Sequence, residues 1–185
     1  GVIQNARELS EELLENGCAN FETMSSGSIN SGGLIGALIA QKSSFVEGIR
    51  YAQEKIEGTM SLAIMTEDSI LCARDKSGRL PILIGERSDG YCFSFESFAY
   101  QKLGYETCHE LKAGEILKLT KDGYEILAEG TDQMKICTFL WTYYGYPTAC
   151  YEGVNVELMR TRNGEIMAES DMKNGKLPDV DWLCQ

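Results

Sequence analysis

The stretch RDKSGRLP at residues 74–81, followed by FES at residues 95–97, decides the fold. One short apolar run leads into residues 74–81 and another leaves them. A glycine and a proline between two apolar runs are typical of a tight turn between strands. Asp75 and Arg79 stand on either side of Gly78, close enough for a charge-assisted hydrogen bond. The sequence therefore predicts a strand–loop–strand unit in which Asp75 and Arg79 pair. The alternative is an ordinary β-hairpin in which the same ion pair is only a surface contact.

Apolar periodicity separates a helical part from a part made of strands. Capping patterns at Asn5 and Ser44 predict helices over 6–16 and 45–57, and the apolar run 34–40 predicts a buried helix. Short apolar runs separated by turn signals predict consecutive antiparallel strands at 60–66, 69–73, 82–85, 91–95, 116–120 and 124–128. Helices that are grouped apart from strands indicate an α+β layered domain.

Composition limits the classes of function. The chain has 185 residues, of which 43% are hydrophobic and 24% are charged, as is ordinary for a globular protein. No apolar run approaches the roughly 20 residues that span a bilayer, and no signal-peptide pattern opens the sequence. The formal charge of −11 argues against nucleic-acid binding, because that binding rests on basic residues that neutralise phosphates. We therefore expect no nucleic-acid partner and no membrane partner.

Cysteine and histidine usage argues against a structural metal site. Seven cysteines are scattered without a C-x-x-C pair, and His109 is the only histidine. Structural zinc sites usually show close ligand pairs, so we expect no metal. An odd number of cysteines in apolar settings is typical of free thiols in a reducing compartment. The sequence therefore predicts a cytoplasmic protein without a disulfide framework.

Several motifs, taken in order along the chain, resemble one family. The pattern R-D-x-x-G-x-x-P is followed by an apolar run that ends in Gly85 and by SFES at 94–97. The motifs LKAGEI at 111–116, ICTFLWTYYGYP at 136–147 and YEGVNVE at 151–157 come next. Together they resemble the amidophosphoribosyltransferases over roughly the whole chain, and the first motifs are similar to the glutaminase domain of class II glutamine amidotransferases.

The resemblance implies an α+β fold of the N-terminal-nucleophile (Ntn) hydrolase type. The chain would hold the larger C-terminal part of a four-layer αββα sandwich with mainly antiparallel sheets, followed by a linker helix. Residues 1–150 would form a glutaminase-like domain that lacks its N-terminal nucleophile segment. Residues 151–185 would form the linker helix, over 156–168, and the first strand, over 179–184, of a truncated phosphoribosyltransferase domain.

The resemblance also implies a reaction. Members of the family hydrolyse glutamine and transfer the ammonia to phosphoribosyl pyrophosphate in de novo purine synthesis. Glutamine is therefore the expected small-molecule partner, and assembly into a homo-oligomer stays open. Mg²⁺ is expected together with phosphoribosyl pyrophosphate, only in the missing domain, so the chain itself is expected to hold no cofactor.

The family's nucleophile is absent from this sequence. The family uses an N-terminal cysteine whose thiol attacks the glutamine amide, with backbone and side-chain donors for the oxyanion. This sequence begins with Gly1, which is expected to serve as an oxyanion donor if it is native. No other catalytic residue is assigned. We therefore predict that the chain alone is inactive, whereas its parent protein is an enzyme.

The residues expected to contact substrate depart from the family pattern. Where the family has Ser-Asp-x-Glu, with the aspartate on the glutamine ammonium, this chain has NSGG at 30–33. Ser31 or Asn30 would take that place as a neutral acceptor. A hydrogen bond to a charged group is worth about 1.5–3 kcal/mol, so its loss is substantial. Either the substrate is held differently or the site is degenerate, and the alternative function is a non-catalytic glutaminase-like regulatory or binding module.

The remaining motif residues are expected to hold the fold and not the substrate. They flank the turn at 74–81 and the second motif that follows it. The residues assigned to this structural loop are Asp75, Gly78, Arg79, Pro81 and Glu96.

Overall fold

The computed structural model describes residues 1–17, 21–22 and 24–176. The chain forms two compact units, Gly1–Cys137 and Thr138–Gln185. The division expected at residue 150 concerns the domains of a longer enzyme and stays a prediction. The strand expected over 179–184 lies outside the described residues.

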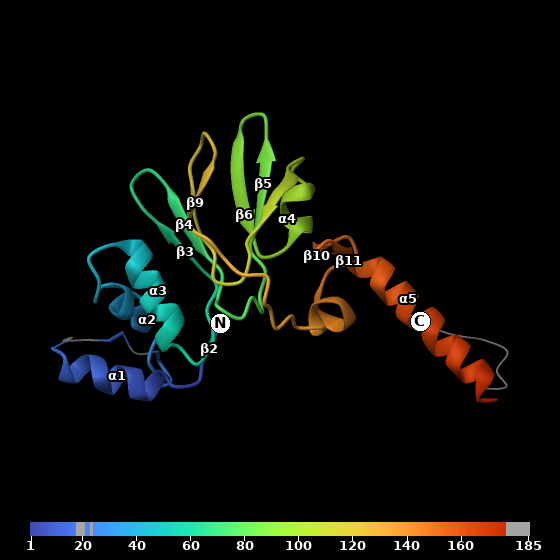
Figure 1. The fold of residues 1–185 in the computed structure, drawn as a ribbon, viewed down its shortest axis with the longest axis horizontal. Coiled ribbons are helices and arrows are strands. Elements are labelled where there is room, and N and C mark those ends of the chain that lie inside the picture. The colour runs from blue at the N-terminus through green and yellow to red at the C-terminus, as the bar shows by residue number, and fades with distance from the viewer. Residues whose placement is uncertain (18–20, 23, 177–185) are drawn as a thin grey trace. The chain divides into compact units, whose positions relative to one another are not determined.

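Helices form one outer layer of the first unit (Figure 1). They are α1 (Ala6–Glu15), α2 (Ser31–Ile39) and α3 (Phe45–Lys55). Side chains cap two of them: Asn30 Oδ1 accepts from the Gly32 N–H at 2.8 Å, and Ser44 Oγ accepts from the Glu47 N–H at 3.3 Å. These bonds satisfy N–H groups that a helix start leaves without a partner inside the helix.

The cap predicted at the start of α1 is wrong. Asn5 precedes the helix, but its side chain makes no cap hydrogen bond. Its Nδ2 donates to Lys55 O at 2.9 Å, and its Oδ1 accepts from the Glu57 N–H at 3.0 Å. Asn5 therefore ties the start of α1 to the chain that leaves α3.

Two antiparallel sheets lie beside these helices. The four-stranded sheet has the order β3 (Leu62–Met65), β4 (Ile70–Ala73), β8 (Ile116–Leu119) and β9 (Tyr124–Ala128). The three-stranded sheet has the order β6 (Gly90–Ser94), β5 (Leu83–Arg87) and β7 (Glu106–Glu110). A short ribbon pairs β1 (Val2–Ile3) with β2 (Gly58–Thr59). The predicted strands are thus present, and β7 is an additional one.

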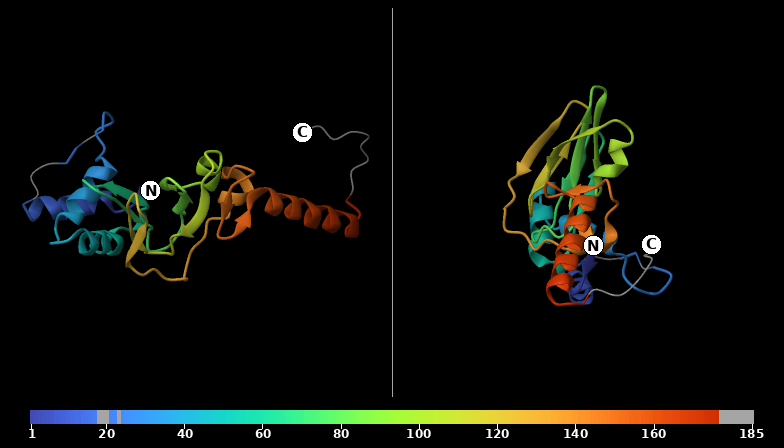
Figure 2. Two further views of the ribbon diagram at one scale, coloured as in Figure 1. Left: turned by 90° about the horizontal axis from the view of Figure 1, so that it is seen from above. Right: turned by 90° about the vertical axis from the view of Figure 1, so that its right-hand side faces the viewer.

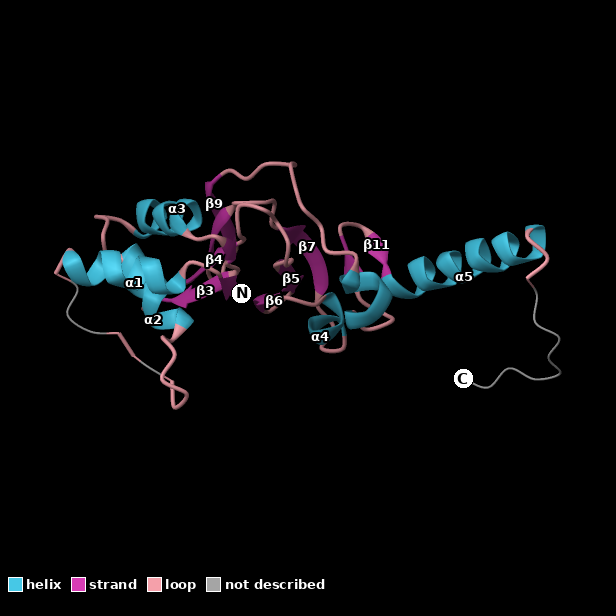
Figure 3. Cartoon of the chain, turned by 90° about the horizontal axis from the view of Figure 1, so that it is seen from below, coloured by secondary structure: helices cyan, strands magenta, loops and turns pink. Residues whose placement is uncertain are grey.

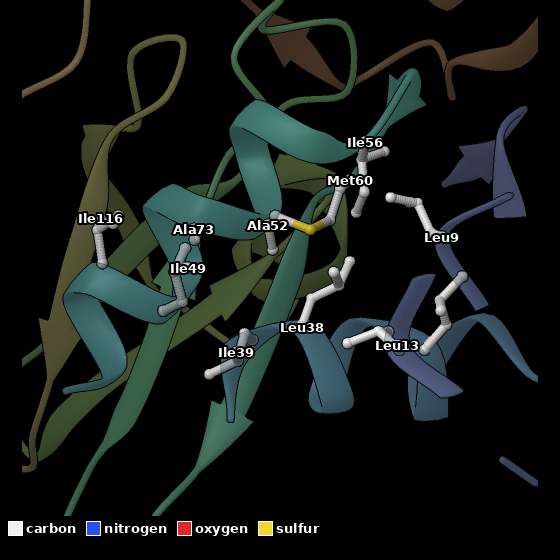
Figure 4. Packing of buried hydrophobic residues seen from close by; sticks show 11 residues of the cluster. Leu9, Leu13, Leu38, Ile39, Ile49, Ala52, Ile56, Met60, Ala73 and Ile116 are labelled. Atoms are coloured by element: carbon white, nitrogen blue, oxygen red, sulfur yellow. The ribbon is translucent and has the colours of Figure 1, made fainter. Parts of the chain in front are cut away.

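The first core lies between the helices and the four-stranded sheet. Leu9 and Leu13 of α1 are buried there with residues of α2 and α3, and with Ala73 and Ile116 of the sheet (Figure 4). Leu34 and Ile49, from α2 and α3, are fully buried. Burying a Leu or Ile side chain contributes about 1.5–3 kcal/mol, so this interface fixes the helical layer on the sheet.

The second core lies between the two sheets. It contains Cys72, Ile82, Ile84, Leu111, Leu117 and Leu119. On the far side of the three-stranded sheet, α4 (Ser97–Gln101) packs Tyr100 against Gly85, where an added Cβ would lie 2.9 Å from the ring. The order is therefore helices, sheet, sheet, helix, as Figure 3 shows. The predicted αββα sandwich with antiparallel sheets is confirmed.

The second unit contains a short π-helix, η1 (Leu140–Tyr144), a hairpin of β10 (Cys150–Tyr151) and β11 (Val154–Asn155), and α5 (Val156–Lys173). Trp141 Nε1 donates to Val154 O at 3.0 Å, and Arg160 Nε donates to Trp141 O at 2.7 Å. Asn155 caps α5 by accepting from the Leu158 N–H at 3.0 Å. The helix predicted over 156–168 is present and extends to Lys173 (Figure 2).

Candidate functional site

Arg74 holds the loop over residues 74–81. Its side chain is buried, with 1% of the residue exposed. Its Nε donates to Leu80 O at 3.1 Å, its Nη1 to Leu111 O at 2.5 Å and its Nη2 to Gly78 O at 2.7 Å. Arg74 follows β4 of one sheet, and Leu111 follows β7 of the other. The guanidinium therefore joins the ends of both sheets.

The predicted pair of Asp75 and Arg79 is wrong. Asp75 is 3% exposed, and its Oδ1 accepts from the Ser77 N–H at 2.9 Å and from the Ser77 hydroxyl. Arg79 is exposed and makes no ion pair with Asp75. The aspartate thus closes an Asx turn within its own loop, which the sequence spacing did not reveal. Its Oδ2 is buried without a hydrogen-bond partner among the described residues.

The other residues assigned to the loop occupy positions that suit a structural role. Gly78 has φ +63°, and an added Cβ would lie 2.8 Å from Met134 Cγ, so both backbone and space favour glycine. Pro81 is buried at the entry to β5, and Glu96 precedes α4. Their assignment as structural residues stays a prediction.

A buried imidazole–carboxylate pair lies beside this loop. His109 Nε2 and Glu115 Oε1 are 2.5 Å apart, and the Glu115 side chain is 1% exposed. Glu115 Oε2 accepts from the Lys112 N–H at 3.1 Å, and the His109 ring stacks on Tyr124 at 5.2 Å between centroids. His109 belongs to β7 and Tyr124 to β9, so the pair connects the two sheets.

Gly1 lies in the ribbon of β1 and β2. A Cβ on Gly1 would lie 2.1 Å from Thr59 O, so the backbone leaves no room for a side chain at this position. The Val2 N–H donates to Thr59 Oγ1 at 3.1 Å, which fixes the neighbouring peptide. Two residues further along, Ser61 Oγ donates to Leu80 O at 3.2 Å. The ribbon therefore adjoins the loop that Arg74 holds.

The two candidate substrate residues lie at the start of α2. Ser31 is exposed, and its side chain makes no hydrogen bond to the described residues. Asn30 is half-buried, and its Nδ2 donates to Glu22 Oε2 at 3.1 Å while its N–H donates to Glu22 O at 2.8 Å. Glu22 is exposed and has no cationic partner among the described residues. The structure thus places a carboxylate beside the position where the family's aspartate is absent.

Sequence reasoning missed Glu22. The pattern of the sequence does not show this contact, because Glu22 and Asn30 meet only through the turn between them. Neither Asn30 nor Ser31 is hydrogen-bonded to Gly1 within the described part of the chain.

Burial makes two titratable groups inert. Desolvation raises the pKa of the Cys72 thiol to about 12, so this cysteine stays protonated at neutral pH. Burial likewise raises the pKa of Tyr100 to about 12, although its hydroxyl shares a 2.6 Å hydrogen bond with Thr107. Neither group is a candidate nucleophile.

The described residues form neither a metal-binding cluster nor a membrane-spanning helix. Over residues 1–17, 21–22 and 24–176, no group of three His, Cys, Asp or Glu side chains gathers in a way that could hold a metal ion. None of the helices in that part of the chain is long and apolar enough to cross a membrane.

Comparison with known proteins identifies the relatives of this sandwich. The chain is 27% identical over 187 residues to the amidophosphoribosyltransferase of Bacillus subtilis, a match that covers 97% of this chain and 38% of that protein. It is 29% identical over 174 residues to the amidophosphoribosyltransferase of Synechocystis, with 91% and 35% covered. The chain is related to the amidophosphoribosyltransferases. The resemblance drawn from the motifs is thereby confirmed.

Solved structures share the fold of this chain. The chain matches glutamine phosphoribosylpyrophosphate amidotransferase from Bacillus subtilis, complexed with ADP and GMP, with a TM-score of 0.77 at 24% identity over 90% of this chain and 36% of that one. It matches a structure described as the allosteric regulatory enzyme of purine biosynthesis with a TM-score of 0.77 at 25% identity, covering 91% and 36%. No family model matches the chain. The chain spans little more than a third of the length of these relatives.

Proposed function

We propose that this chain is the glutamine-binding part of an amidophosphoribosyltransferase. The observation that carries the proposal is the match to such enzymes over 91–97% of the chain, on a sandwich with the same fold. The whole enzyme would break the amide C–N bond of glutamine with water, which gives glutamate and ammonia. The ammonia would then displace pyrophosphate from phosphoribosyl pyrophosphate and give phosphoribosylamine.

In this proposal the start of α2 holds the amino-acid end of glutamine. The ammonium lies against the Glu22 carboxylate, which Asn30 positions through Nδ2. Ser31 supplies a hydroxyl acceptor in the first turn of the helix. A carboxylate that is within about 4 Å of an ammonium attracts it by roughly 1–4 kcal/mol, depending on how much water remains. Glu22 would thus replace the charge that the NSGG sequence lacks.

Gly1 would contribute backbone and not side-chain chemistry. Its tight approach to Thr59 O and the bond from the Val2 N–H to Thr59 Oγ1 hold the ribbon in place. Because the Val2 N–H is used by Thr59 Oγ1, the Gly1 N–H would be the donor that stabilises the oxyanion of an amide under attack. The thiol nucleophile and every step on phosphoribosyl pyrophosphate or its Mg²⁺ belong to parts of the enzyme other than these residues. Self-association and a cytoplasmic location stay predictions.

The test is glutamate release from glutamine by the full-length natural protein. The Glu22→Gln variant should raise the KM for glutamine by about tenfold or more and leave kcat nearly unchanged, because the ammonium contact is the same in ground and transition states. Glu8→Gln, an exposed change on α1, is the matched control and should alter neither constant.

The two possible failures are distinguishable. Absence of any glutamine-dependent glutamate release from the full-length protein would reject the enzymatic proposal and favour the non-catalytic module. Normal glutamate release with the same KM in Glu22→Gln and in the unmodified protein would keep the enzyme and reject Glu22 as the ammonium partner.

A further inference from the structure

The chain contains the same labile dipeptide in three structural settings. Asn-Gly occurs at 16–17, 163–164 and 174–175. In such a pair the glycine nitrogen attacks Asn Cγ, a Cγ–N bond forms, and the Cγ–Nδ2 bond breaks. Nδ2 leaves as ammonia with the proton that the attacking nitrogen gave up. Water then opens the cyclic imide to aspartate or isoaspartate. The backbone must swing to bring these atoms together, so local structure controls the rate.

Asn16 is the least restrained of the three. It ends α1 as the C-cap residue and is exposed, and its side chain makes no hydrogen bond to the described residues. Gly17 has φ +89°, and a Cβ built on it would meet nothing within 4 Å. Within the described part of the chain, the backbone bonds that hold the pair are those of the last turn, Asn16 N–H to Glu12 O and Gly17 N–H to Leu14 O, each 3.1 Å long.

The other two pairs are held more firmly. Asn163 and Gly164 lie inside α5, so rotation there breaks the helix on both sides, and Asn163 Nδ2 contacts Met159 Sδ at 3.1 Å. Asn174 ends α5, but its Nδ2 donates to Ser170 O at 2.8 Å, and the Lys176 N–H closes the helix end on Asp171 O at 2.9 Å. These bonds hold the Nδ2 group that would leave as ammonia, so we expect slower cyclisation at both pairs.

We infer that Asn16 is a site of spontaneous deamidation in the folded protein, with Asn174 slower and Asn163 slowest. The product places a new carboxylate at the C-terminal end of α1, where the helix dipole disfavours negative charge. That last turn has no basic residue and already carries Glu12 and Glu15. Isoaspartate also lengthens the main chain at the point where the helix ends. Deamidation should therefore loosen the last turn of α1.

The test is peptide mass spectrometry of residues 1–185 incubated at mildly alkaline pH, which favours loss of the proton from the attacking nitrogen. Aspartate and isoaspartate are counted at each of the three pairs, in the folded chain and in the chain unfolded by guanidinium. In the folded chain Asn16 should convert at least about tenfold faster than Asn163, which corresponds to ~1.4 kcal/mol of extra local opening. In the unfolded chain the three rates should converge.

Two results would overturn the inference. One is equal conversion of the three pairs in the folded chain, or fastest conversion at Asn163 or Asn174. The other comes from Asn16→Gln, whose longer side chain cyclises far more slowly. This variant should lose the main acidic species seen on ion exchange, and its persistence would show that Asn16 is not the site.

Discussion

The loop over 74–81 matches the motif of the amidophosphoribosyltransferases, whereas the start of α2 departs from it. The loop keeps the family motif, and its Arg74 and Asp75 are buried and hydrogen-bonded to backbone groups. The start of α2 departs from the motif, and Ser31 and Glu22 are exposed there. The motif residues Arg74 and Asp75 thus make internal contacts that hold the fold. At the site proposed for the ligand, the carboxylate is that of Glu22, which precedes the motif in the sequence and contacts Asn30.

The largest expected effect is at Arg74. Arg74→Met removes a buried guanidinium from the carbonyls of Gly78, Leu80 and Leu111, and of these only Leu80 O keeps another donor among the described residues, the Ser61 hydroxyl. The free energy of unfolding should fall by about 3–5 kcal/mol, measured by denaturant unfolding. Arg74→Lys keeps the charge but can reach fewer carbonyls, so its free energy of unfolding should lie between those of the unmodified protein and Arg74→Met. A loss below about 1 kcal/mol in Arg74→Met would show that the loop does not depend on this side chain.

The next effect is expected at the pair that joins the sheets. His109→Ala leaves the buried Glu115 carboxylate with the Lys112 N–H as its remaining hydrogen-bond donor among the described residues, and should cost about 3 kcal/mol. The double variant His109→Ala, Glu115→Gln should recover part of that loss, because it removes the unpaired charge. A double-mutant cycle by thermal unfolding measures the coupling, and additive losses would contradict a direct pair.

Within the loop itself, substitution of Asp75 should destabilise the fold more than substitution of Arg79. Asp75→Ala removes the acceptor of the Ser77 N–H and hydroxyl and should lower the free energy of unfolding by about 1–3 kcal/mol. Arg79→Ala changes an exposed side chain and should stay within about 0.5 kcal/mol of the unmodified protein. If the two variants lost equal amounts of unfolding free energy in the same experiment, the result would favour the Asp75–Arg79 ion pair that the spacing predicted.

The smallest effect is expected at the cap of α2. Asn30→Asp keeps an acceptor for the Gly32 N–H and adds charge at a favourable helix end, but it removes the donor to Glu22 and sets two exposed carboxylates side by side. These terms nearly cancel, so the free energy of unfolding should change by less than about 0.5 kcal/mol. Asn30→Ala removes the cap and should cost about 1 kcal/mol. A loss as large in Asn30→Asp would show that the Glu22 contact stabilises the fold.

The sequence predicted most of the fold because its signals are local. Gly78 and the short apolar runs mark turns and strands with a period that needs no distant partner. The strand β7 was missed because its residues, ETCHE, are polar and charged, and pairing with β5 determines its conformation. Asn5 was assigned as a cap because the pattern fits, but its partners are Lys55, the last residue of α3, and Glu57, which follows that helix.

The candidate site was less predictable because its contacts are not local. The Asp75 assignment failed because Ser77, two residues away, competes with Arg79 for the same carboxylate. Arg74 donates to the carbonyl of Leu111, and no feature of the sequence shows which carbonyl a buried arginine meets. Glu22 approaches Asn30 only through the fold of the loop between them. The resemblance located the position of the missing aspartate, and only the structure brought another carboxylate to it.

The contrast between the two regions can be measured directly by amide NMR of residues 1–185 during titration with glutamine at millimolar concentration. The account predicts shifts of the Asn30, Gly32 and Gly33 amides, and no shifts in the loop over 74–81. The same titration with the analogue that lacks the α-amino group should leave these amides unchanged, as should glutamine added to Glu22→Gln. Shifts confined to residues 74–81, or equal shifts with the analogue, would contradict the claim that the start of α2 holds the glutamine ammonium.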